Sequence, residues 1–224
     1  MRRMGLLTLG QAPRADGLAR EVGAVLGPGV ELLERGALDL LSRAEVAALA
    51  PGPRGTALVT LLRGGEEVAL DRALLLPHLQ RGLQDLEAGG AEAVLLVCSG
   101  EFPELASERP LLVPHELLYR MACSLLPARS TLGVLMPLER QLPDMEREFA
   151  ALGVRARGAS ASPYGAAADL RAAAAQLHDA GAALVYLDCF GYDRGQKELV
   201  RAVAGCPVLL ARSAAARAIA DVLE

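Results

Sequence analysis

Two cysteines occupy matching positions at the ends of buried apolar runs. Cys98 closes the run AVLLVC before Ser99-Gly100, and Cys189 closes the run ALVYLDC before Phe190-Gly191. A thiol between a strand and a helix N-terminus meets backbone N–H groups and the positive end of the helix dipole, which stabilise its thiolate. Such a cysteine can act as a nucleophile or carry a proton. The competing interpretation is structural, because cysteine is among the most commonly buried residues.

A symmetric pair of thiols suits one reaction in particular. Inverting a carbon acid removes a proton from one face and delivers another to the opposite face, and two such groups can do this without a cofactor. The intermediate is an enediolate or carbanion, so the site also needs donors for an oxyanion or carboxylate. Ser99, Gly100 and Gly191 could donate to the oxyanion, and Arg14 could hold a carboxylate through two parallel hydrogen bonds.

Further candidate binding residues lie in loops that the sequence places after strands. Gln11 lies in the same loop as Arg14, and Tyr192 lies in the same loop as Cys189. Ser162 and Tyr164 lie in a third loop. Ligands of open parallel sheets bind outside the carboxyl ends of the strands. Five loops meet this rule, at residues 10–14, 98–102, 136–139, 160–164 and 189–193. For each of these side chains an ordinary turn or solvated role is the alternative.

The elements that would position these residues alternate along the chain. Short apolar runs, several of them continuous as in parallel strands buried on both faces, are separated by Ala- and Leu-rich amphipathic stretches, which is typical of an α/β fold. We predict strands at 5–9, 30–34, 58–62, 93–98, 111–113, 131–136, 154–159, 183–188 and 207–211. We predict helices at 13–26, 72–88, 116–125, 139–152, 165–180, 194–204 and 213–223. Gly64-Gly65 indicates a β-hairpin.

An internal similarity predicts two domains. Residues 87–102 and 179–193 both run from a helix ending at Ala-Gly, through a buried strand, to a cysteine with glycine two residues later. We therefore expect two similar parallel-sheet α/β domains, at 1–114 and 115–211. The final helix, within 212–224, could cross back and complete the first domain, and the sequence leaves this open.

The composition excludes several classes of partner. The chain has 224 residues, and 23 Lys and Arg against 27 Asp and Glu give a net charge of −4. This balance offers no cationic field for nucleic acid or an anionic membrane surface. Aromatic residues make up only 3% of the chain and Trp is absent, so recognition of bases by stacking is not expected. No apolar run approaches about 18 residues, so we expect no membrane span and a cytoplasmic protein.

The sequence also lacks the motifs of common metal and nucleotide-cofactor sites. In the cytoplasm the four cysteines are expected as thiols, and no C-x-x-C pair or zinc-like spacing of His and Cys is present. The loop after the first strand has no G-x-G-x-x-G pattern, so it is not a dinucleotide fingerprint. We expect neither a metal nor a cofactor. Cys123, inside a helical run, and Cys206, before Pro207, are interpreted as structural.

Motifs along almost the entire chain resemble the AroM family, in collinear order. They include LTLGQAPR, LVTLLRGGEEV, LLVCSGEFP, GVLMPLERQ, LDCFGY and PVLLARSAAARA. More remotely, the layout is similar to the aspartate/glutamate/hydantoin racemase superfamily. That resemblance implies two flavodoxin-like domains related by a pseudo-twofold, a ligand cleft between them, no cofactor, and one acid/base cysteine from each domain at Cys98 and Cys189.

The motifs also depart from those racemases. Their first loop, an acidic residue with Ser and a glycine run, is replaced by Gly10-Gln11-Ala12-Pro13-Arg14, and an arginine there suggests a substrate with an additional carboxylate. The leading hypothesis is a racemase or isomerase acting on a small carboxylate-bearing carbon acid. One alternative is a decarboxylase or cis–trans isomerase that needs a single cysteine. Another is a non-catalytic metabolite-binding or regulatory protein. Ala/Leu-rich helix faces would permit a homodimer.

Overall fold

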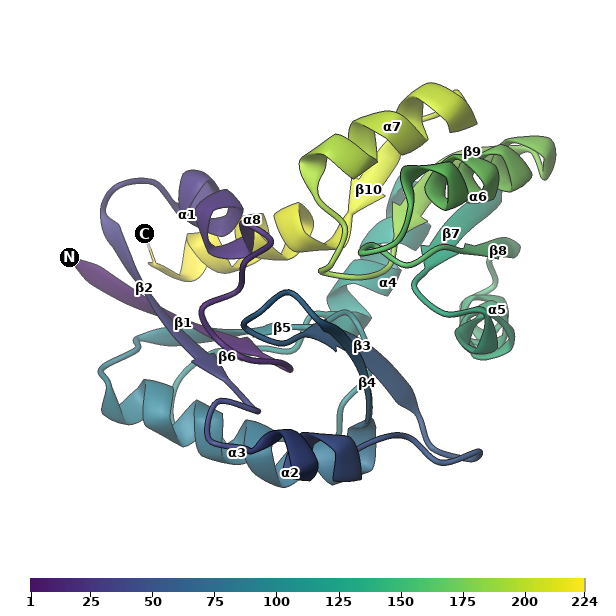
Figure 1. Ribbon diagram of the computed structural model, residues 1–224. Coiled ribbons are helices and arrows are strands. Elements are labelled where there is room, and N and C mark those ends of the chain that lie inside the picture. The colour runs from purple at the N-terminus through teal and green to yellow at the C-terminus, as the bar shows by residue number, and fades with distance from the viewer. Residues whose placement is uncertain (224) are drawn as a thin grey trace. The chain divides into compact units, whose positions relative to one another are not determined.

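The computed structural model describes residues 1–223, which divide into two compact units. The first unit is Met1–Pro114 together with the chain from Ala215, and the second is His115–Ala214. Each unit contains one four-stranded, all-parallel sheet covered by helices (Figure 1). The described chain is therefore an α/β protein with two parallel sheets.

The first unit orders its parallel strands β2-β1-β5-β6, with α1 on one face of the sheet and α3 on the other (Figure 1). An antiparallel hairpin, β3–β4, stands apart from that sheet. The elements are β1 (Arg2–Thr8), α1 (Leu18–Leu26), β2 (Val30–Gly36), α2 (Arg43–Ala48), β3 (Ala57–Leu61), β4 (Glu67–Asp71), α3 (Arg72–Ala88), β5 (Ala93–Val97) and β6 (Leu111–Leu112).

The second unit orders its strands β10-β9-β7-β8, with α6 and α7 on one face and α4 and α5 on the other (Figure 1). The elements are α4 (His115–Leu125), β7 (Thr131–Met136), a 3₁₀ turn η1 (Glu139–Gln141), α5 (Leu142–Ala151), β8 (Ala156–Ser160), α6 (Ala167–Asp179), β9 (Ala182–Leu187), α7 (Arg194–Ala204), β10 (Val208–Leu210) and α8 (Ala211–Leu223). Helix α8 begins in this unit and continues into the residues that pack with the first.

The two sheets follow one plan. In each, the first strand has the second on one side and a later strand, β5 or β9, on the other. Gly5 of β1 pairs with Val94, and Gly133 of β7 pairs with Val185. Each of these valines lies four residues before the cysteine of its unit. A Cβ at either glycine would lie about 3 Å from that valine side chain, so both positions favour glycine for close packing. The main difference is that the first unit inserts α2 and the β3–β4 hairpin.

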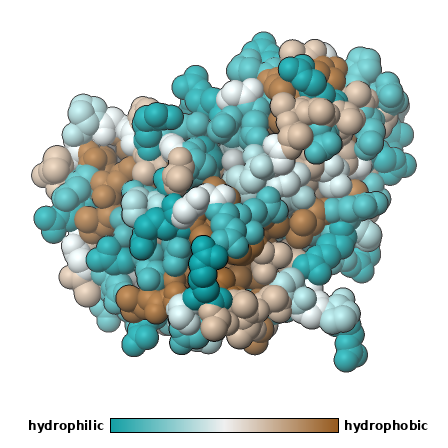
Figure 2. All heavy atoms as spheres, viewed as in Figure 1, coloured by the Kyte–Doolittle hydropathy of each residue, from teal (hydrophilic) through white to brown (hydrophobic). Residues whose placement is uncertain are grey.

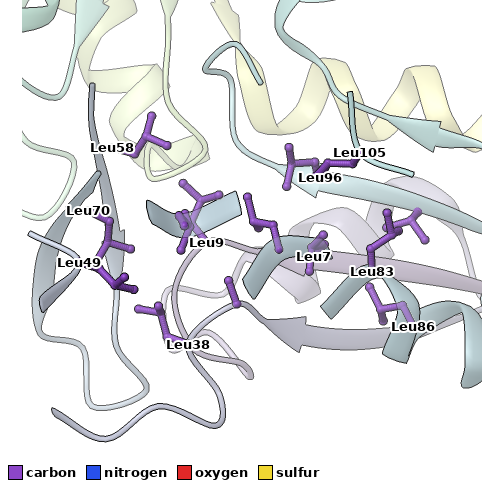
Figure 3. Packing of buried hydrophobic residues seen from close by; sticks show 14 of the residues in the cluster. Leu7, Leu9, Leu38, Leu49, Leu58, Leu70, Leu83, Leu86, Leu96 and Leu105 are labelled. Atoms are coloured by element: carbon purple, nitrogen blue, oxygen red, sulfur yellow. The ribbon is translucent and has the colours of Figure 1, made fainter. Parts of the chain in front are cut away.

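Leucine side chains fill the core of the first unit. Leu7 and Leu96 of neighbouring strands, Leu83 and Leu86 of α3, and Leu58 of the hairpin belong to one buried cluster (Figure 3). Strands β1 and β5 are buried along nearly their whole length because helices cover both faces, which accounts for their continuous apolar sequences. The hairpin is thus anchored to the core of its unit.

Two local expectations require correction. Helix α1 begins at Leu18 rather than at residue 13, because Asp16 pairs with Arg14 within the loop and Gly17 precedes the helix with a left-handed φ of 72°. Helix α2 was not expected. Its signal is the capping box at Ser42, which accepts a hydrogen bond from the Glu45 N–H while the Glu45 carboxylate accepts one from the Ser42 N–H.

The visible surface mixes polar and apolar residues. On the face shown in Figure 2, hydrophobic residues form patches interrupted by hydrophilic ones. The most exposed large hydrophobic side chains away from the N-terminal Met are Leu40, Leu125 and Val222. In the part of the chain that the structure describes, no helix combines the length and apolar character needed to cross a bilayer.

Candidate active site

Both cysteines lie at the switch point of their own sheet. The carboxyl ends of β1 and β5 are adjacent, with Thr8 paired to Val97, and those of β7 and β9 are adjacent, with Leu135 paired to Leu187. Chains leaving such strands diverge to opposite sides, and the crevice between them is where open parallel sheets bind ligands. Cys98 follows β5 directly, and Cys189 follows β9 after one residue.

Each of the two sulfur atoms accepts a hydrogen bond from the glycine N–H two residues further along the chain. The Gly100 N–H donates to the Sγ of Cys98 at 3.3 Å, and the Gly191 N–H donates to the Sγ of Cys189 at 3.3 Å. Both side chains are half-buried and neither forms a disulfide. A backbone N–H donated to sulfur stabilises a thiolate more than a thiol, so each glycine supplies a donor that a thiolate can use.

The expected helix N-terminus follows only one of the cysteines. Helix α7 begins at Arg194, shortly after Cys189, whereas Cys98 leads into a long loop that ends at β6. Glu101 in that loop contacts Arg72 of α3, which also donates to the Glu101 carbonyl at 2.9 Å. The predicted helix dipole is therefore wrong for Cys98, whose sulfur keeps only the glycine N–H in common with Cys189.

The loop after β1 holds Arg14 and Gln11 in internal contacts. The Arg14 side chain is 3% exposed, makes a two-point pair with Asp16, and donates to the Thr8 hydroxyl at 3.4 Å. Gln11 donates to the Leu38 carbonyl at 3.3 Å and accepts from the Arg63 N–H at 3.0 Å. Arg14 does meet a carboxylate, as its chemistry suggests, but that carboxylate belongs to its own loop.

The second unit packs its candidate donors around Gly191. A Cβ at this glycine would lie 2.5 Å from Pro163 and 2.7 Å from the Tyr164 hydroxyl, so the Tyr164 side chain borders the Cys189 loop. The Tyr164 N–H donates to the Ser162 hydroxyl at 3.1 Å, which shapes this second loop. Gly191 thus permits a close approach that places Tyr164 beside the candidate catalytic loop.

Two candidate binding residues are enclosed by protein. Tyr192 is fully buried and donates its hydroxyl to the Ala161 carbonyl at 2.6 Å. Ser99 is buried directly after Cys98. Tyr192 therefore ties the Cys189 loop to the loop after β8, while Ser99 lies at the carboxyl end of β5.

A buried carboxylate precedes Cys189. Asp188 accepts hydrogen bonds from the hydroxyls of Tyr119 at 2.9 Å and Tyr186 at 3.0 Å. Burial, followed by the charge of Asp188, raises the pKa of both tyrosines well above the ordinary value of about 10. Tyr119 also stacks on Phe149 at a centroid separation of 4.3 Å, so this network joins β9 to α4 and α5. Asp188 therefore has a structural hydrogen-bonding role in this network.

The other two cysteines have different surroundings. Cys123 lies on α4 and Cys206 lies between α7 and β10, and burial raises the pKa of both thiols. Within residues 1–223, no three His, Cys, Asp or Glu side chains gather as a metal site would require.

Arg212 is the site neighbour that the sequence reasoning missed. It lies in the first turn of α8, is only 1% exposed, and donates through Nε and Nη2 to the Phe190 carbonyl at 3.0 and 2.7 Å. The available signal was a lone arginine directly after the apolar run PVLLA, where a charge is costly to bury unless it is paired.

Comparison with known proteins places this chain in a family. The family model described as "AroM protein" matches residues 4–223. The chain belongs to the AroM family. No curated protein matches the sequence.

The fold of this AroM chain is also that of solved racemases and isomerases. The match to an allantoin racemase from Pseudomonas fluorescens covers 99% of this chain and 90% of the racemase chain, with a TM-score of 0.60 and 18% identity. A glutamate racemase from Bacillus anthracis matches 99% and 81%, with a TM-score of 0.66 and 13% identity. A maleate isomerase from Pseudomonas putida S16 matches 99% and 92%, with a TM-score of 0.63 and 11% identity.

Proposed function

We propose that this protein is a cofactor-independent racemase or isomerase for a small carbon acid that bears a carboxylate. The observation that carries the proposal is the repeated environment of Cys98 and Cys189. The two cysteines follow corresponding strands, β5 and β9, at the switch point of each sheet. Each sulfur accepts a hydrogen bond from the N–H of the glycine two residues further along the chain. A structural cysteine requires neither the position nor the donor.

In the proposed reaction the two sulfurs have complementary roles. One thiolate takes the proton from the substrate carbon, forming an S–H bond as the C–H bond breaks, and the electron pair passes into the adjacent carbonyl or carboxylate group. The other thiol then delivers its proton to the opposite face, which restores the C–H bond with inverted configuration. The two roles exchange for the opposite enantiomer.

The remaining candidates would hold the substrate. The hydroxyls of Ser162 and Tyr164 are the proposed donors to the developing oxyanion. Arg14 is the proposed cation for the substrate carboxylate, which would have to displace Asp16 from the guanidinium. Solved proteins of this fold include racemases, an arylmalonate decarboxylase and a maleate isomerase, so compounds of these classes form the first substrate panel.

The test is loss of the α-proton signal in D₂O, followed by proton NMR under reducing conditions. The panel contains free amino acids, allantoin and other hydantoins, and 2-substituted dicarboxylates. We expect exchange with one compound, and Cys98→Ser or Cys189→Ser should each lower its rate at least about 10²-fold. The matched controls Cys123→Ser and Cys206→Ser should leave the rate unchanged.

Each other outcome contradicts the two-cysteine proposal in a distinct way. Activity that depends on only one of the two cysteines would indicate the decarboxylase or cis–trans isomerase chemistry. A compound that raises the thermal stability of the protein, with no exchange and no effect of either cysteine substitution, would indicate a binding protein. Ligand at 100 times its dissociation constant stabilises a protein by about 2.7 kcal/mol, which is readily measured.

A further inference from the structure

Arg212 is a buried cation attached to the loop that carries Cys189. Its guanidinium donates from Nε and Nη2 to the Phe190 carbonyl, at 3.0 and 2.7 Å, and from Nη2 to the Gly191 carbonyl at 3.2 Å. Burying this charge is expensive unless hydrogen bonds compensate it. A neutral side chain of similar size would avoid the cost, so a charge at this position calls for an explanation.

The peptide between Phe190 and Gly191 links the arginine to the sulfur. Its carbonyl oxygen accepts from Arg212, and its N–H donates to the Sγ of Cys189 at 3.3 Å. The only cis peptide among residues 1–223 is Ala12–Pro13, so this peptide is trans. In a planar trans peptide the C=O and N–H point in opposite directions, and one amide therefore stands between the guanidinium and the thiol.

We infer that Arg212 is a positioning residue, which holds the Phe190–Gly191 peptide with its N–H directed at Cys189 and thereby stabilises the thiolate. The guanidinium fixes the orientation of the peptide dipole. It also polarises the amide, which strengthens the hydrogen bond that the opposite end donates. This role rests on the proposed function of Cys189 as an acid/base group, although the stabilisation itself requires no substrate.

The charges around Cys189 within its unit explain why such a cation is needed. Asp188 directly precedes the cysteine and is buried, so its carboxylate opposes a second negative charge nearby. Asp193 caps α7 by accepting the Gln196 N–H at 2.8 Å. The titratable and charged groups beside the Cys189 loop are Tyr164, Tyr186, Asp188, Asp193 and Arg212. Among these, Arg212 alone is cationic.

The test measures thiol alkylation against pH in Arg212→Gln and Arg212→Lys. Cys98 and Cys189 are followed in the same sample by mass spectrometry, so Cys98, in the other unit, serves as the internal control. In Arg212→Gln we expect the midpoint for Cys189 to rise by about one pH unit, which lowers its alkylation about tenfold near neutral pH. Arg212→Lys should show a smaller rise because the charge is kept, and the Cys98 profile should not move.

Two results would overturn the inference. One is a folded Arg212→Gln variant whose Cys189 profile matches wild type. The other is a shift of the Cys98 profile in Arg212→Gln as large as that of Cys189, which would mean that the substitution disturbs the whole fold rather than one peptide. Alkylation needs no substrate, so the two proposals can fail separately. If the enzymatic proposal alone is wrong, no compound exchanges its proton in D₂O, but Arg212→Gln still raises the alkylation midpoint of Cys189.

A measurement on the intact protein covers the case in which the variants do not fold. The proton resonances of the Gly191 N–H and the Arg212 Nε–H should both shift with the midpoint at which Cys189 ionises. Both shifts should vanish in Cys189→Ser. An Arg212 resonance that stays constant while Cys189 ionises would refute the coupling through the peptide.

Discussion

Asp188 and Arg212 bring opposite charges to the segment around one cysteine. The carboxylate accepts from the hydroxyls of Tyr119 and Tyr186, and the guanidinium donates to the Phe190 carbonyl. Each buried charge is thus compensated by hydrogen bonds rather than left in an apolar environment. These hydrogen bonds offset the cost of burying both groups, and they also hold the backbone on either side of Cys189 in a defined path.

The buried tyrosines predict a loss of stability at alkaline pH. Because folding raises the pKa of Tyr119 and Tyr186, both phenols stay protonated in the native state, while the unfolded chain ionises them near pH 10. Their contribution to the free energy of unfolding is therefore complete below about pH 10 and declines above it, by about 1.4 kcal/mol per pH unit for each tyrosine. Urea unfolding at increasing pH measures this decline.

The tyrosine assay has a clear optical signal and a matched control. The chain lacks Trp, so phenolate absorbance reports its four tyrosines without interference. Tyr119→Phe should reduce the alkaline loss, whereas Lys197→Arg, which removes the only lysine, should leave it unchanged. An equal loss in Tyr119→Phe and wild type would contradict the assignment.

Helix α7 fixes the far end of the Cys189 loop through its N-terminus. Asp193 accepts from the Gln196 N–H, and the Gln196 side chain accepts from the Asp193 N–H and donates to the Pro163 carbonyl at 2.7 Å. The capping box therefore starts the helix and also holds the loop after β8. The same device starts α2 at Ser42 in the first unit.

Removal of the α7 cap should destabilise the protein by a modest amount. Asp193→Ala loses the acceptor for the Gln196 N–H, and we expect the free energy of unfolding to fall by about 1 kcal/mol. Asp193→Asn keeps a cap acceptor and should lose less. Denaturant titration distinguishes the two, and an Asn variant as unstable as the Ala variant would show that the charge of Asp193, rather than its hydrogen bond, stabilises the helix.

At the scale of the whole molecule, the chain contributes to the first unit at both ends of its sequence. Residues up to Pro114 and those from Ala215 belong to one unit, while the intervening hundred positions form the other. Helix α8 spans this boundary, and its residues Ala215, Ala216 and Ile219 are buried. The C-terminal segment is therefore part of the packed structure of the first unit.

Truncating one side chain of α8 should weaken the first unit selectively. Ile219→Ala removes a side chain that is 2% exposed, and we expect a loss of about 2–5 kcal/mol. Hydrogen exchange should then accelerate in β1 and β5 more than in β7 and β9. Val222→Ala, at an exposed position of the same helix, is the control and should change little. Equal acceleration in both sheets would contradict the division into units.

The sequence by itself determined much of the local structure. The bounds of α3, β7 and α7 agree with their predictions at residues 72–88, 131–136 and 194–204, and the alternation of elements predicted the α/β class. These features depend on helical or strand periodicity and on capping residues that lie next to one another in the chain. The position of both cysteines at strand ends follows from the same local pattern, as does the hairpin at Gly64-Gly65.

Only the tertiary structure decided which side chains meet. Arg212 lies 22 positions from Phe190, and Tyr119 lies 69 positions from Asp188, so neither contact leaves a trace in local periodicity. The pairing of Arg14 with Asp16 is short in sequence, yet it depends on a loop path that replaces the expected first turn of α1. Burial sets the cost of each unpaired charge, and burial is a property of the assembled fold rather than of any segment.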